Sequence, residues 1–205
     1  LRPSLRLLKR GPAADAVAAI GKRLTGESIY TYRFHVAVDP EINAYALPGG
    51  HVVVNTGLLD AADGAAEVAG VLAHEISHVE QRHTLRNLVL ALGWRAMLGA
   101  ATGDFTGGYW SEMAARLVSL GYSRKLESEA DMEGLEILRR AGVAPHGMAS
   151  FFEKLAARRE APPSLLSSHP ADAERLAALR AAISSQPPGD LLPLGVDWER
   201  LELER

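Results

Sequence analysis

One stretch decides the fold and the chemistry expected of this chain, VLAHEISHV at residues 71–79. It holds the pattern H-E-x-x-H within apolar residues at helical spacing. On a helix His74 and His78 lie one turn apart on one face, so both imidazoles can bind one tetrahedral Zn²⁺. Glu75 follows the first histidine and can reach a metal-bound water rather than the metal. The stretch therefore predicts a catalytic zinc site with Glu75 as its general base.

A catalytic zinc site needs a third protein ligand. The H-E-x-x-H-x-x-G-x-x-H pattern is absent, so this ligand must come from elsewhere in the chain. Glu127 and Asp131 share one face of a later predicted helix, and two leucines continue that stripe, so this face should turn inward. Glu129 and Glu133 should face solvent. Glu127 and Asp131 are therefore the candidates for the site.

A further histidine, His83, lies roughly half a turn around the helix from His74. It cannot join the same metal ion while the helix continues. We therefore expect a capping or structural role for His83.

Composition places the chain among globular proteins. The 205 residues are 47% hydrophobic and 23% charged, with a net charge of −3 and no cysteine. Disulfide scaffolds, cysteine-ligated zinc and thiol catalysis are therefore excluded. The basic residues form no dense cluster, so we expect no nucleic-acid partner. We expect a single catalytic domain at residues 1–185 and a C-terminal tail at residues 186–205.

Strand patterns come early and helix patterns come late. The strand patterns cover residues 33–39 and 51–56, with a Pro-Gly-Gly turn before the second, which suggests a hairpin or a pair of sheet edges. Helix patterns cover residues 13–24, 65 to about 91, 111–120, 123–141, 146–159 and 171–183. This order predicts an α+β fold, mostly helical, with a small sheet packed on the helical body.

Five motifs together resemble the M48 family of zinc peptidases, in the order expected for that family. The resemblance spans roughly residues 33–180 and is closest in type to the soluble bacterial BepA-like and Oma1-like groups. The motifs are NAYALPGG at residues 43–50, residues 52–59, residues 74–83, SRKLESEAD at residues 123–131, and Ser168-His169-Pro170 with Arg175.

The resemblance implies a zincin-like fold of the gluzincin type, with the sheet beside the active-site helix. It implies one Zn²⁺ per chain, held by His74, His78 and Glu127, with Asp131 as a partner of a ligand histidine. His169 and Arg175 join the catalytic residues by the same resemblance, and either side chain could stabilise the oxyanion. His169 approaches the metal in soluble members of the family and there acts as a gate.

The chain lacks the transmembrane helices of the Ste24 and HtpX types, so we expect a soluble or peripheral enzyme. The resemblance implies a zinc-dependent metalloendopeptidase that cleaves protein substrates in bacterial envelope quality control. The expected location is the periplasm or cell envelope. Polypeptides are the expected substrates, and peripheral membrane association and a partner domain or protein both stay open.

Three alternatives stay open from the residues alone. The chain could be a metal-retaining, chaperone-like module without catalysis, although Glu75 argues against it. Residues 85–98 could form an interfacial helix on a membrane, a core helix or a lid over the cleft. His169 could gate the metal, contact the oxyanion or cap the following helix, and residues 99–108 form a candidate lid that would move with it.

The substrate should lie as an extended strand against an edge at Asn43, Ala44, Tyr45 and Ala46, because backbone pairing suits a protease of broad specificity. The alternative for residues 43–50 is a plain turn between two strands.

Overall fold

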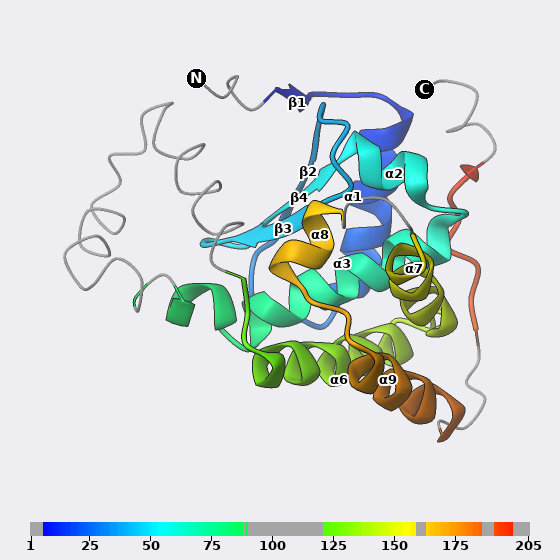
Figure 1. Ribbon diagram of the computed structural model, residues 1–205. Helices are drawn as coiled ribbons and strands as arrows, with labels where there is room; N and C mark the ends of the chain where they lie inside the picture. The colour runs from blue at the N-terminus through cyan, green and yellow to red at the C-terminus, as the bar shows by residue number, and fades with distance from the viewer. Residues whose placement is uncertain (1–5, 88, 90–120, 159–162, 186–190, 199–205) are drawn as a thin grey trace.

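The computed structural model describes residues 6–87, 89, 121–158, 163–185 and 191–198 (Figure 1). Its strands are β1 (Leu7–Leu8), β2 (Arg33–Ala37), β3 (Ala44–Leu47) and β4 (His51–Asn55). Its helices are α1 (Pro12–Leu24), α2 (Thr56–Ala61), α3 (Ala65–Glu80), α6 (Arg124–Arg140), α7 (His146–Ala156), α8 (Ser164–Ser168) and α9 (Ala173–Ser185). The predicted α+β fold, mostly helical with one small sheet, is confirmed.

The sheet has the strand order β1-β2-β4-β3. The two predicted strands, β2 and β4, are parallel neighbours, so the expected hairpin between them is wrong. The Pro-Gly-Gly turn instead joins β4 to β3, an antiparallel strand that the sequence patterns do not predict. Gly49 and Gly50 both have positive φ angles, 85° and 77°, and a Cβ on Gly50 would lie 2.1 Å from the Thr31 carbonyl oxygen. Only glycine suits both conditions at Gly50. The turn leaves β3 as an edge strand of the described sheet.

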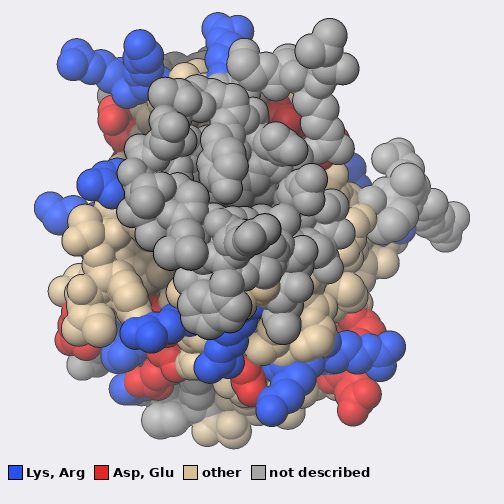
Figure 2. Space-filling model, turned by 90° about the vertical axis from the view of Figure 1, so that its left-hand side faces the viewer, with Lys and Arg blue, Asp and Glu red and all other residues tan. Residues whose placement is uncertain are grey.

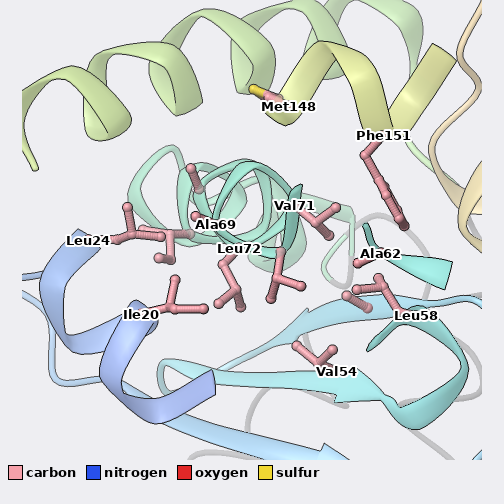
Figure 3. Close-up of a cluster of buried hydrophobic side chains, with 14 of the residues drawn as sticks. Ile20, Leu24, Val54, Leu58, Ala62, Ala69, Val71, Leu72, Met148 and Phe151 are labelled. Atoms are coloured by element: carbon pink, nitrogen blue, oxygen red, sulfur yellow. The ribbon is translucent and has the colours of Figure 1, made fainter. Parts of the chain in front are cut away.

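Helix α3 forms the middle of the molecule, between the sheet with α1 on one side and α6 and α7 on the other (Figures 1 and 3). Apolar side chains from these elements meet around it. They include Ile20 and Leu24 of α1, Val54 of β4, Leu58 of α2, Leu72 of α3, and Met148 and Phe151 of α7.

Helices α3 and α7 approach each other closely. A Cβ on Gly70 would lie 2.5 Å from the Met148 Cα, and one on Gly147 would lie 2.3 Å from the Ala66 carbonyl oxygen. These glycines let the two backbones come nearly into contact, which fixes α3 against α7.

Twelve consecutive residues of α3, from Glu67 to His78, are buried. A buried polar side chain is costly unless it finds partners. Glu67 finds them in the Lys154 ammonium at 2.5 Å and the Ser150 hydroxyl at 3.0 Å. The histidines of α3 must find theirs at the centre described below.

Two helical segments differ from the sequence prediction. The helix predicted to run from residue 65 to about 91 ends at Glu80, because Arg82 takes a positive φ of 57° and turns the chain. Part of the expected polar turn at residues 167–170 belongs to helix α8. The predicted helix at residues 111–120, the candidate lid at 99–108 and most of the segment 85–98 lie outside the described residues.

The described part of the C-terminal tail contacts the body. The amide of Leu192 donates to the Gly142 carbonyl at 2.9 Å, and Arg23 donates to the Pro193 carbonyl at 2.6 Å. The division into a catalytic domain and a tail stays a prediction. Among the described helices, none has the length and hydropathy needed to cross a bilayer.

Acidic and basic residues alternate along the lower margin of the face shown in Figure 2.

Candidate metal centre

Four buried side chains converge on one point: His74 and His78 from α3, Glu127 from α6, and His169 just after α8. Their candidate ligand atoms all lie within 4.8 Å of one another. His74 Nε2 is 3.1 Å from His78 Nε2 and 3.1 Å from His169 Nδ1. The Glu127 carboxylate is 3.4 Å from His74 Nε2, 3.5 Å from His78 Nε2 and 2.9 Å from His169 Nδ1.

These separations fit a divalent metal ion. Tetrahedral ligands with bonds of about 2.0–2.1 Å to zinc stand about 3.3 Å apart. Three imidazole nitrogens and one carboxylate oxygen, all directed at one buried point, make a donor set typical of zinc. The four side chains therefore fit a zinc ion.

Local structure brings the ligands to this point. His74 and His78 stand one turn apart on α3, and the close contact of α3 with α6 places Glu127 opposite them. Helix α6 begins with Ser123 as its N-cap, whose hydroxyl accepts from the Leu126 amide. This cap fixes the helix start one turn before Glu127.

Asp131 and Arg175 support the ligands from behind. Asp131 Oδ1 lies 3.0 Å from His74 Nδ1, which favours the tautomer whose Nε2 lone pair points into the centre. The buried Arg175 guanidinium donates to both Asp131 oxygens, and its Nη1 lies 2.6 Å from Glu127 Oε2. This geometry favours a positioning role for Arg175 over the expected contact with an oxyanion.

Burial and neighbouring charges shift the pKa values of the ligand side chains in the metal-free centre. Burial opposes protonation of His74, but Glu127 and Asp131 outweigh it and raise the pKa of His74 to about 9. Burial lowers the pKa of His78 well below its usual value. Burial would raise the pKa of Glu127, but His169 and His74 hold it far below the ordinary range. The metal-free centre thus keeps a proton that a metal ion would displace on binding.

Glu75 is buried beside this centre. Neither of its carboxylate oxygens has a hydrogen-bond partner among the described residues. The His169 imidazole lies beside it, with Nε2 3.3 Å from Glu75 Oε1. Burial raises the pKa of Glu75, against the opposing pull of His169 and His74.

The predicted substrate residues lie on or next to the edge strand β3, which contacts α3. Asn43, Ala44 and Ala46 are buried, and Tyr45 is half-buried. The backbone of Ala46 lies near enough to Glu75 to favour its charged form. The edge and the proposed base are therefore adjacent.

Sequence reasoning missed three residues around His78. The ring of Tyr122 stacks on His78 with a centroid distance of 3.9 Å. His83 is fully buried, with its Nδ1 3.1 Å from His78 Nδ1, and Glu129 lies beyond it. The position of His83 could have been predicted only if the sequence had shown that α3 ends near residue 81, and no residue there is typical of a helix end. Tyr122 directly precedes the N-cap Ser123, but nothing in the sequence ties it to His78.

Comparison with known proteins identifies the family. Residues 14–183 match peptidase family M48. The chain belongs to this family. It is 32% identical over 174 residues to the metalloprotease LoiP of Escherichia coli, which covers 82% of this chain and 68% of the relative.

Two further relatives carry similar names. The chain is 33% identical over 205 aligned residues to the beta-barrel assembly-enhancing protease of E. coli, covering 88% of this chain and 41% of the relative. It is 37% identical over 149 residues to the mitochondrial metalloendopeptidase OMA1 of Arabidopsis thaliana, covering 72% of this chain and 30% of the relative. The M48 chain described here thus spans less than half of these two longer relatives. The resemblance stated from the motifs is confirmed.

The donor set predicts one divalent metal ion per chain. His74→Ala, His78→Ala and Glu127→Ala should each lose it, because each removes a ligand from a closed set. Metal content of purified variants by plasma emission spectroscopy checks this. Glu129→Ala is the matched control on α6 and should retain most of the metal. Loss of metal from Glu129→Ala with retention in Glu127→Ala would show that the ligand face of α6 is assigned wrongly.

Proposed function

We propose that this M48 metalloprotease is a zinc endopeptidase that hydrolyses internal peptide bonds of polypeptide substrates. The observation that carries the proposal is the buried cluster of three imidazoles and one carboxylate with Glu75 beside it. When bound, the zinc ion supplies a Lewis acid that polarises a carbonyl group and acidifies a water molecule. The ligand set is His74, His78 and Glu127, with His169 as a fourth donor.

Glu75 acts as the general base and then the general acid. Its carboxylate accepts a proton from the attacking water and passes it to the leaving amine. Burial beside the centre raises the pKa of Glu75, which makes the carboxylate a better proton acceptor. Of its two carboxylate oxygens, one can hold the water while the other carries the proton.

The substrate pairs with the edge strand β3. An extended peptide beside Asn43, Ala44, Tyr45 and Ala46 would add a strand to the sheet through its backbone. This binding mode needs little from the substrate side chains, which suits cleavage of varied unfolded proteins. The closeness of Ala46 to Glu75 places the paired backbone next to the proton acceptor.

The relatives' names support a role in the bacterial envelope. One is named for enhancing beta-barrel assembly, which points to protein quality control there. A periplasmic or envelope location, with or without membrane association, belongs to this proposal. A metal-retaining chaperone-like module is the alternative, and the buried Glu75 carboxylate argues against it because a purely structural site gains nothing from burying a carboxylate that is not a ligand.

His169 gates the centre in this proposal. Its Nδ1 lies 3.1 Å from His74 Nε2 and 2.9 Å from the Glu127 carboxylate, so it would serve as a fourth donor to a metal ion held there. A catalytic zinc site needs that fourth position for water. Hydrolysis then requires His169 to withdraw, and contact with the oxyanion is the alternative use of the same imidazole.

The first test of catalysis is Glu75→Gln. The change keeps the shape of the side chain but removes the base, so we expect metal to be retained and hydrolysis of casein to fall by about 100-fold or more. Metal content and casein cleavage of the same preparation are the measurements. Glu136→Gln, on the solvent side of α6, should change neither. Full activity in Glu75→Gln would refute the assigned base.

The second test is His169→Ala. Gating predicts that metal is retained and peptide hydrolysis rises, because the fourth position becomes free for water. The measurements are metal content and initial rates with a fluorogenic peptide. His146→Ala, an exposed histidine at the start of α7, is the control. A fall in rate by about 100–1,000-fold would assign His169 to the oxyanion instead, and an unchanged rate would leave it a structural role.

A further inference from the structure

An apolar pocket of about 440 Å³ lies against the metal centre. It forms where the end of β3 and its turn meet the C-terminal end of α3. His78, a proposed metal ligand, is part of its wall, so the pocket borders the centre on the His78 side. Apolar wall residues include Leu47, Pro48, Val79 and Leu85.

The chemistry of the pocket favours an apolar guest. Its volume falls within the range of about 300–1,000 Å³ usual for ligand pockets. The Leu85 side chain is 38% exposed at this pocket. Covering its apolar surface with an apolar group would be energetically favourable. Arg82 is exposed and is the charged side chain among the described lining residues.

We propose that this pocket receives a large apolar side chain of the polypeptide substrate, aromatic or of leucine size. The inference rests on the proposed function and names the substrate class it prefers. A peptide paired with β3 advances about 3.3 Å per residue. One that passes Ala46 and Glu75 therefore reaches Leu47 and the pocket within a few residues.

The pairing direction fixes which substrate residue enters. Antiparallel pairs outnumber parallel ones, and β3 already pairs in that way with β4. An antiparallel peptide lays its amino-terminal part beside the C-terminal end of β3, where the pocket opens. The preferred apolar residue therefore lies on the amino-terminal side of the cleaved bond.

The experiment uses the zinc-loaded full chain and a fluorogenic peptide in which each position in turn is Ala or Phe. We expect Phe at one position before the cleaved bond to raise kcat/KM by about 10-fold or more over Ala. Equal cleavage of all peptides, or a preference confined to positions after the cleaved bond, overturns the assignment of the pocket to a substrate side chain. Absence of any zinc-dependent cleavage overturns the proposed function, and the pocket assignment with it.

Two variants tie the preference to the pocket. Leu85→Glu places a charge in its wall, and Thr31→Trp fills it from the opposite side, so both should lower the ratio of Phe to Ala cleavage. Val38→Glu is the matched control, because Val38 is 42% exposed and lies away from the pocket. It should leave the ratio unaltered. An unaltered ratio in both pocket variants refutes the assignment even if wild type prefers Phe.

A second inference comes from an independent contact, between His78 and His83. The turn at Arg82 brings His83 back over the end of α3, where it is fully buried. Its Nδ1 lies 3.1 Å from His78 Nδ1, and its Nε2 lies 3.3 Å from Glu129 Oε2.

We infer that His83 is a positioning residue for His78. His78 Nε2 faces the centre, so its proton belongs on Nδ1, which donates to His83 Nδ1. Because His83 Nδ1 accepts this hydrogen bond, the proton of the His83 ring lies on Nε2, which faces Glu129. The pair thus orients His78 as Asp131 orients His74. Glu129, 40% exposed, forms the weaker outer end.

Zinc affinity, measured by chelator competition on the full chain, tests this inference. His83→Ala should raise the zinc Kd by about 10–100-fold. His83→Asn should recover part of the loss, because its amide oxygen can accept the same proton. Glu129→Gln should weaken binding less, and Glu133→Gln, on the same helix, should not. A purely structural His83 would lower the melting temperature of the metal-free protein while leaving Kd unchanged, and that result would overturn the inference.

Discussion

The burial of α3 is the constraint on which the rest of the structure depends. The helix is covered on every side between Glu67 and His78, by the sheet, α6 and α7. Polar side chains placed there must be satisfied by other protein groups or by a ligand, because water cannot reach them. Glu67 and the two histidines of α3 therefore need polar partners on the neighbouring elements. Glu67 meets Lys154, and the two histidines meet Glu127 and His169.

The supporting contacts give the centre its precision. Asp131 holds His74, Arg175 ties Asp131 to Glu127, and His83 holds His78. These residues come from α6, α9 and the turn after α3, so the ligand positions depend on helices joining correctly rather than on one loop. An M48 fold built in this way can present Glu75 and the edge strand to a substrate while the ligands stay fixed.

The sequence predicts the fold class, the Pro-Gly-Gly turn and the ligand helices well, because each has a local cause. The spacing of His74 and His78 makes the two-histidine face. The strand that the turn joins to β4 was not predicted, because β3 is short and its pairing depends on the sheet as a whole. The inward face of α6 also follows from its leucine stripe. The end of α3 does not follow, since Arg82 carries no sequence signal for a positive φ. The contacts of His83, Tyr122 and Arg175 depend on that turn or on tertiary packing, which spacing alone does not reveal.

In the proposed centre, three imidazoles and one carboxylate close on a single metal ion. X-ray absorption spectroscopy at the zinc edge of the zinc-loaded chain is the direct test of this donor set. We expect only nitrogen and oxygen neighbours at about 2.0–2.2 Å, with outer-shell scattering from three imidazoles. Loss of one imidazole in His169→Ala would complete the assignment. A wild-type spectrum with fewer than three imidazoles would contradict it.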